Sequence, residues 1–367
     1  MPLFVAIVCC HCCCHCLLPL FVAIVDVLSH TGTGCFTLCN VGDKVVQSKH
    51  GLLSTVAVRQ QHNTHHKQTL LSSHLTVHFP RPSHSPLNPH SIPLLQYKLG
   101  PKHNNKICYA LEGSVPFAGA CIEWLVKRLE LIPSSASSEA LCDSDDNGGV
   151  YFVPAFSGLY APYWRDDARG VIVGLTRYSN KAHLVRAALE AVCFQTKEVC
   201  DAMRADAQMS GVNLGNLNVL KVDGGMTVNA LLMNMQCNIL DCEVQRPRIV
   251  ETTALGAAYV AGLATGYFQD VNEVSNQWKL DKTFVPDHHA YSKARRDQEF
   301  ARWKRAIKRT LNWTNDTDPN EDDGDNINKE QWNRPLGRDA ATGFATGALV
   351  TASLCAVLAL LWHRIKL

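Results

Sequence analysis

The stretch LKVDGGMTVNALLMN, residues 220–234, decides the fold, and its pattern continues on either side. Its apolar start predicts a strand, Asp223-Gly224-Gly225 predicts a tight turn, and the residues after the turn have the apolar spacing of a helix. We expect strands over residues 217–222 and 243–246, and helices over residues 228–240 and 253–265. Strands and helices that alternate in this way indicate an α/β layered fold.

Two more helices are expected upstream. Residues 112–132 carry apolar side chains at helical spacing, among them Val115 and Leu129. Ser179 or Asn180 can cap a second helix that runs to about Met203, because their side chains accept hydrogen bonds from free backbone amides. The chain from residue 111 onward therefore has the pattern of an ordinary globular domain.

Two glycine turns are candidate phosphate sites. We name them the TGTG turn, residues 31–34, and the DGG turn, residues 223–225. Glycine lets backbone N–H groups approach phosphate oxygens, and a helix that starts at the turn adds partial positive charge. The sequence has neither G-x-x-x-x-G-K-[ST] nor a G-x-G-x-x-G that opens a helix. A P-loop enzyme and a dinucleotide-binding enzyme are therefore disfavoured.

Composition narrows the class of protein. The 367 residues hold 35 Lys and Arg against 33 Asp and Glu, a net charge of +2. This balance gives no broad basic field, so nucleic acid is not an expected partner. Apolar residues make up 46% of the chain, which is enough for a core and excludes a wholly disordered protein. The 16 Cys are too sparse for a small disulfide scaffold, and unpaired Cys suit a reducing compartment.

Residues 1–30 form a low-complexity leader. The heptapeptide PLFVAIV occurs twice and flanks the run CCHCCCHC, and the first 25 residues carry no charge. A signal peptide would have a basic start, which is absent here. Cys and His are zinc and copper ligands, but ligands at adjacent positions cannot all converge on one tetrahedral ion. A repetitive stretch without a metal is the favoured interpretation.

Residues 58–96 are expected to be a disordered insertion. They contain seven His, five Pro and no acidic residue, and they show neither helical nor strand periodicity. A His-rich metal or pH-sensing loop is one hypothesis. A second is a retained intron, because Val58-Arg59 and Gln96 could be encoded by intron-border sequences. A structureless loop of this length is unusual inside a compact domain, which favours an insertion.

The remaining segments closely resemble glycerol kinases of the FGGY carbohydrate-kinase family. Residues 170–190 fit the C-terminal signature of that family, GVIVGL, seven residues, then HLVRAALE. The resemblance covers residues 31–57 and 97–300. The signature lies within the matching stretch YFVPAFSGLYAPYWRDDARGVIVGLTRYSNKAHLVRAALE (residues 151–190). The other matching stretches are TGTGCFTLCNVGDKVVQSKHGLLSTVA (31–57), YALEGSVPFAGACIEWL (109–125), LKVDGGMTVNALLMN (220–234) and ETTALGAAYVAGLATGYF (251–268).

The resemblance implies the C-terminal lobe of an actin-like (ribonuclease H-like) ATPase fold, over residues 31–57 and 97–308, with ATP and Mg²⁺ as cofactors. By position in the matching motifs, the residues near nucleotide would be Thr33, Gly119, Glu123, Gly225 and Asn229. Position 123 is often Gln or Arg in the family, so Glu123 is a departure from its pattern. An acid there would repel phosphate but could accept a hydrogen bond from ribose. Phe36 would pack against the carbon chain of glycerol, or it is an ordinary core residue.

The N-terminal motifs of the family are missing from the chain. They are a DQGTTS-type phosphate loop and a Gly-Asp-Gln motif whose Asp is the catalytic base. Asp166, Asp167 and Asp223 are candidate substitutes, but their positions in a loop and at a strand end favour structural roles. No catalytic residue and no metal ligand is therefore assigned. Since phosphoryl transfer needs both sides of the cleft, we expect this chain to be catalytically impaired.

The end of the chain predicts a membrane anchor. Residues 309–339 form an acidic linker, and residues 340–362 carry no charge over 23 positions. At about 1.5 Å per residue a helix of this length crosses a hydrocarbon core of about 30 Å. Gly343 and Gly347 would permit close helix packing. We expect a tail anchor in the outer mitochondrial membrane with the lobe facing the cytosol, and a cytoplasmic location is the alternative.

Three functions remain open from the sequence. The first is an ATP:glycerol 3-phosphotransferase, as the resemblance implies. The second is a non-catalytic, membrane-tethered nucleotide-binding scaffold. The third is a kinase for another polyol or sugar, because most residues that contact substrate in the family are absent. The expected partners are glycerol and, through residues 340–362, a membrane; a homo-oligomer is also compatible with the sequence.

Overall fold

The computed structural model describes residues 27–42, 44–60, 98–99, 108–142, 146–215 and 217–314. The tail anchor expected at residues 340–362 lies outside these ranges, as do most of the leader, of the insertion and of the acidic linker. Residues 27–30 belong to the first strand, so regular structure begins earlier than the expected boundary at residue 31. Regular structure also continues to Gln60, past the expected start of the insertion.

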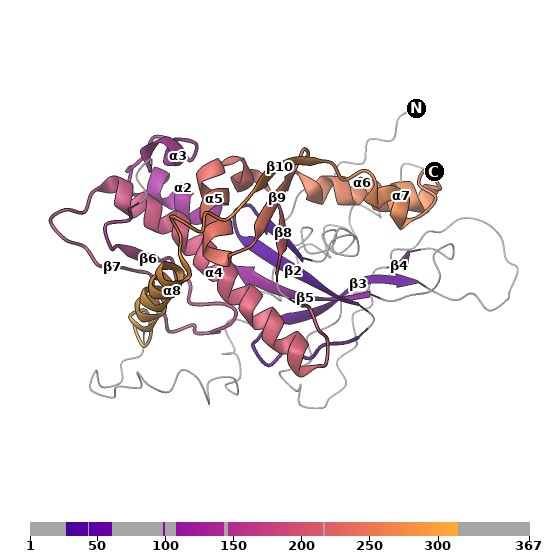
Figure 1. Ribbon diagram of the computed structural model, residues 1–367, viewed down its shortest axis with the longest axis horizontal. Helices are drawn as coiled ribbons and strands as arrows, with labels where there is room; N and C mark the ends of the chain where they lie inside the picture. Colours follow the sequence, from indigo (N-terminus) through magenta and orange to yellow (C-terminus); the bar gives the residue numbers. More distant parts are fainter. Residues whose placement is uncertain are drawn as a thin grey trace, which may run out of the picture.

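A mixed eight-stranded sheet is the centre of the described part (Figure 1). Its order is β10-β9-β8-β1-β2-β5-β3-β4. Neighbours β9, β8 and β1 run parallel, and β2 is antiparallel to both β1 and β5. The strands are β1 (Val27–Thr31), β2 (Cys35–Gly42), β3 (Leu53–Gln60), β4 (Lys98–Leu99), β5 (Cys108–Val115), β8 (Val219–Asp223), β9 (Glu243–Pro247) and β10 (Leu280–Phe284). Strands β6 (Tyr151–Val153) and β7 (Val171–Val173) form a separate pair.

The longest described helix, α4 (Lys181–Met209), lies across the sheet and packs against β2 and β5. Asn180, one of the two caps expected from the sequence, caps it by accepting hydrogen bonds from the amides of Ala182 and His183. The other helices are α2 (Gly119–Lys127), α3 (Ser137–Leu141), the short 3₁₀ helix η1 (Gly225–Val228), α5 (Ala230–Leu240), α6 (Thr252–Thr265), α7 (Val271–Ser275) and α8 (Lys293–Lys308).

The core is built on both sides of α4. Towards the sheet, its buried residues Val192, Val199 and Met203 pack with residues of β2 and β5, among them Cys35 and Leu111. On another side, the ring of Phe194 stacks on Trp303 of α8, with ring centroids 5.3 Å apart. Burial of such rings contributes strongly to stability, so α4 joins the sheet to α8.

The strands and helices expected around the DGG turn are confirmed as β8, α5, β9 and α6. The helix expected over residues 112–132 is wrong at both ends, and it stops at Lys127 instead of residue 132. Residues 112–115 belong to strand β5, and the helix starts only at Gly119. Ala110, Leu111, Glu112 and Val115 are all buried, so β5 shows no alternation of apolar and polar residues that would indicate a strand.

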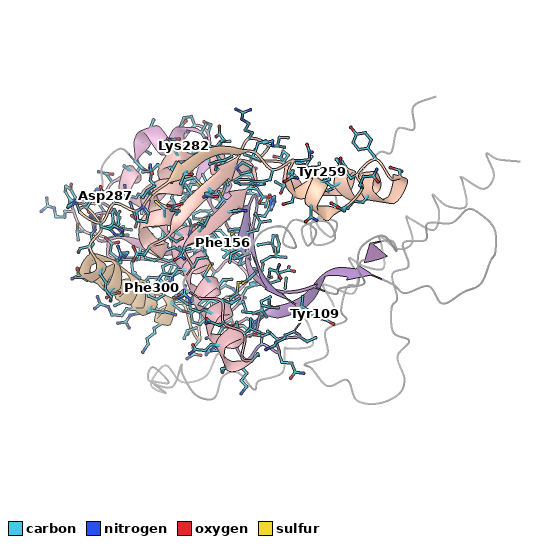
Figure 2. All side chains as sticks on the ribbon, turned by 45° about the vertical axis from the view of Figure 1, so that its right-hand side comes forward. Tyr109, Phe156, Tyr259, Lys282, Asp287 and Phe300 are labelled. Atoms are coloured by element: carbon cyan, nitrogen blue, oxygen red, sulfur yellow. The ribbon has the colours of Figure 1, made fainter. Side chains whose placement is uncertain are left out.

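Helices α6 and α7 extend from one end of the sheet, at the upper right of Figure 1. Figure 2 shows Tyr259 of α6 on this extension, apart from Phe156 and Phe300 in the body. Within the described residues, no helix is both long enough and apolar enough to span a membrane.

Candidate functional site

The carboxyl ends of two parallel neighbours, β1 and β8, lie at the same edge of the sheet. The TGTG turn follows β1, and the DGG turn closes β8. A Cβ atom built on Gly224 would lie 2.6 Å from the carbonyl oxygen of Thr31, so the two turns touch. The topology thus brings together two glycine turns that are far apart in the sequence.

Helix α2 starts at the same place. The amide of Gly119 donates to the carbonyl of Gly32 at 2.9 Å, and the amides of Ala118 and Ala120 donate to the carbonyl of Thr33 at 3.1 and 3.0 Å. A Cβ atom on Gly119 would also lie 3.3 Å from the sulfur of Met226 in η1. Three of the residues predicted near nucleotide, Thr33, Gly119 and Gly225, therefore belong to adjoining segments.

The two glycines of the DGG turn differ in their surroundings. Gly224 is buried and has φ +91°, a conformation that other residues rarely adopt. Gly225 is exposed, and a Cβ atom built on it would meet no atom of the described residues within 4 Å. The first glycine is therefore required by the backbone, whereas the second leaves open space at the start of η1.

Asn229 is the N-cap of α5. Its side-chain oxygen accepts from the amide of Leu232 at 2.9 Å, and its nitrogen donates to the Ser138 hydroxyl of α3 at 3.1 Å. Glu139 of α3 accepts from the amide of Ala230 at 3.3 Å. Short helix α3 is thus held over the start of α5, and the side chain of Asn229 already has two partners.

Glu123 and Phe36 lie at different distances from the turns. Glu123 is exposed on α2, one turn beyond Gly119, and pairs with Lys127. Phe36 is partly buried on β2, next to the TGTG turn, where its backbone is directly opposite His30 of β1. The structure therefore places Phe36 beside the turn, and it directs Glu123 towards Lys127.

Arg246 of β9 supports the DGG side of the site. Its guanidinium donates to the carbonyl of Thr227 at 2.9 Å and pairs with Asp281 at 2.6 Å. These contacts attach the last turn of η1 to β9 and β10. No local sequence pattern indicates this contact, because it depends on the order of strands in the sheet.

His30, which belongs to none of the motifs above, lies at the edge where the TGTG and DGG turns meet. His30 and Asp223 are directly opposite each other on β1 and β8, with Nδ1 of the imidazole 3.0 Å from Oδ1 of the carboxylate. Asp223 has no exposed surface, and among the described residues its Oδ2 has no hydrogen-bond partner. In the sequence, His30 is marked only by being a polar residue directly before the TGTG turn.

The pKa values of His30 and Asp223 are both raised above their ordinary values. Burial by itself lowers the pKa of His30, but the hydrogen bond and charge of Asp223, with Glu251 farther away, outweigh it and the pKa is raised. Burial raises the pKa of Asp223 despite the opposing effect of His30. In the described ranges no group of three or more His, Cys, Asp or Glu side chains could hold a metal ion.

Comparison with known proteins assigns this architecture to a family. The model of the FGGY family of carbohydrate kinases, C-terminal domain, matches residues 82–265. A glycerol kinase of Chloroflexus aurantiacus is 46% identical over 283 residues, which are 77% of this chain and 47% of that protein. A glycerol kinase of Beijerinckia indica is 42% identical over 287 residues, 78% of this chain and 46% of that protein.

Comparison with solved structures supports the same family. Plasmodium falciparum glycerol kinase with ADP has a TM-score of 0.61 and 32% identity, over 82% of this chain and 50% of that chain. Ligand-bound xylulose kinase of Lactobacillus acidophilus has a TM-score of 0.56 and 16% identity, over 79% of this chain and 49% of that chain. At this identity the similarity supports the fold alone. The predicted actin-like kinase lobe is thereby confirmed. The chain spans about half the length of the curated relatives it matches.

Proposed function

Because the chain belongs to the FGGY family of carbohydrate kinases, we propose that the edge formed by the TGTG turn, the DGG turn and the start of α2 binds ATP. We propose further that the bound nucleotide serves phosphoryl transfer to a polyol, with glycerol as the acceptor and glycerol 3-phosphate and ADP as products. The similarity to glycerol kinases supports the choice of glycerol.

One observation carries the proposal, namely the meeting of three glycine-containing segments at one edge of the sheet. Thr33 and Gly225 are exposed there, and Gly119 joins α2 to the TGTG turn. Backbone amides at such turns and at helix starts favour anionic oxygens because they add partial positive charge without bulk. The chain's own groups would thus bind and orient the phosphates, which is the main contribution of a protein to phosphoryl transfer.

Mg²⁺ and glycerol would join the nucleotide at this edge. Mg²⁺ is usually held by substrate phosphates, a few carboxylates and water, and it neutralises charge on the phosphates. We assign it no protein ligand. Phe36, beside the TGTG turn, would pack against the carbon chain of glycerol, while the general base that accepts the hydroxyl proton is not assigned.

The test is nucleotide binding by the full chain and by Gly225→Ala. A methyl group at Gly225 meets no atom in the part of the chain that the structure describes, so the unfolding midpoint should be unchanged, but the methyl would occupy space that a phosphate needs. Calorimetric titration should show ADP binding to the wild type and at least about tenfold weaker binding to the variant. Equal affinities would exclude the DGG turn as the phosphate site.

The acceptor is tested separately. ADP formation by the full chain would be measured with glycerol, xylulose and gluconate, since xylulose and gluconate kinases share the fold. A preference for glycerol at low turnover supports the proposal, whereas full turnover would contradict the catalytic impairment expected of this chain. ATP binding without transfer to any acceptor would instead favour a nucleotide-binding scaffold.

The uncharged segment at residues 340–362 supports a second proposal, a form tethered to the outer mitochondrial membrane. Fractionation of cells that express the full chain or a chain ending at residue 339 would test it. Membrane association that depends on the segment supports the tether. Identical distributions of the two chains would contradict the tether and favour the cytoplasmic alternative.

A further inference from the structure

The edge formed by the TGTG turn, the DGG turn and the start of α2 also contains a pair of ionisable side chains, which the glycine turns do not need for their own geometry. His30 precedes the TGTG turn by one residue, and Asp223 is the last residue of β8. Their side chains meet at 3.0 Å, and 13% of the His30 side chain is exposed whereas Asp223 is fully buried. The imidazole therefore lies between a buried carboxylate and the surface of the site.

The orientation of the ring leaves its other nitrogen near the turn. Nδ1 contacts Asp223, and a Cβ atom built on Gly32 would lie 3.4 Å from Nε2. In an imidazolium both ring nitrogens are donors, so Nε2 can donate towards a group bound at the TGTG turn. Asp223 acts as the positioning residue that determines which nitrogen is left for that group.

The negative charges near His30 favour the protonated form of its ring. Asp223 faces the ring from β8, and Glu251, just before α6, acts electrostatically on both His30 and Asp223. Two carboxylates near a polyphosphate would repel it unless a cation stood between them and the ligand. In its ionised form, a carboxylate as deeply buried as Asp223, with Oδ2 unsatisfied among the described residues, is also stabilised by a neighbouring cation.

We propose that His30, oriented by Asp223, donates a hydrogen bond from Nε2 of its protonated ring to a phosphate oxygen of the bound nucleotide. This inference rests on the proposed nucleotide site and assigns that site a specific cation. It makes nucleotide affinity depend on the protonation of a single side chain. Loss of the proton, and with it of a charge-assisted hydrogen bond, weakens binding by about tenfold or more.

The experiment titrates ADP and, as a control without phosphate, adenosine into the full chain by calorimetry, below pH 6.5 and at alkaline pH. ADP affinity should fall by about tenfold at alkaline pH, and adenosine affinity should not. His30→Gln should bind ADP weakly at both pH values and lose the difference. A variant that binds ADP with the affinity and pH dependence of the wild type would overturn the inference.

Two further measurements keep the test decisive if His30→Gln folds poorly. In the wild type, the NMR titration of the His30 ring should move to higher pH when ADP is added, and an unmoved titration would overturn the inference. Asp223→Asn keeps a hydrogen-bond acceptor but removes the charge, so ADP affinity should fall at a lower pH than in the wild type. If the wild type binds neither ADP nor adenosine, the nucleotide site itself is wrong, which is a different result from pH-independent ADP binding.

Discussion

The amide of Gly119 donates a 2.9 Å hydrogen bond to the carbonyl oxygen of Gly32, and this contact attaches the start of α2 to the TGTG turn. The carbonyl of the next residue, Thr33, accepts from the amides on either side of Gly119. The position of the turn therefore depends on the position of α2. A change at Gly119 should displace the TGTG turn through the backbone.

We predict that Gly119→Ala destabilises the protein and weakens ADP binding. Alanine normally stabilises a helix relative to glycine by about 1 kcal/mol. Here its Cβ would lie 2.6 Å from the carbonyl oxygen of Gly32, so α2 or the turn must move. Overpacking of this kind costs about 1–3 kcal/mol, measurable by urea unfolding. A net gain in stability would show that α2 and the TGTG turn accommodate the added methyl group without strain.

The sequence predicted the site better where a motif is local than where it depends on pairing. The DGG turn, its flanking strand and helix, and the Asn180 cap follow from residues within one stretch. The His30–Asp223 pair depends on the register of two strands separated by most of the domain, and no local pattern reports that register. The last four residues of β5, 112–115, fall in the expected helix, because the strand is buried on both faces and so lacks the alternation that identifies a strand.

A second prediction concerns the loop between β2 and β3. Asp206 of α4 is fully buried and accepts from the Ser48 hydroxyl, the Lys49 amide at 2.9 Å and His50 Nδ1 at 2.6 Å. Asp206→Ala leaves these donors without their acceptor, which should cost about 2–5 kcal/mol of unfolding free energy.

The matched control is Asp201→Ala on the same helix. Asp201 is partly exposed and pairs with Lys197 at 2.9 Å, so its loss should cost less than about 1 kcal/mol. Chemical denaturation of both variants measures the difference. Similar costs for the two would mean that Asp206 does not organise the loop.

A third prediction concerns the cap of α4. Asn180→Ala removes the acceptor for the amides of Ala182 and His183 and should lower the unfolding free energy by about 1 kcal/mol. Asn180→Asp keeps a side-chain oxygen in place and should restore most of this loss. Thermal unfolding of the three proteins would be compared. A loss in Asn180→Asp as large as in Asn180→Ala would contradict the capping role.

The last prediction concerns acid stability. Burial by itself raises the pKa of Asp167, but hydrogen bonds from Arg165 and the amide of Asn312, with the charge of Arg165, outweigh it and lower the pKa below the usual 3.8. A carboxylate whose pKa is lowered on folding stabilises the protein above its unfolded pKa, and the stabilisation disappears as the pH falls through its folded pKa. Asp167→Asn should therefore be less stable than the wild type at neutral pH, and the difference should vanish in strong acid, below the folded pKa. Because Asp167 joins the loop at Arg165 to the backbone after α8, urea unfolding followed at both pH values would detect the link. A difference in stability that stayed constant down to that acid limit would show that the contribution of Asp167 does not depend on its charge.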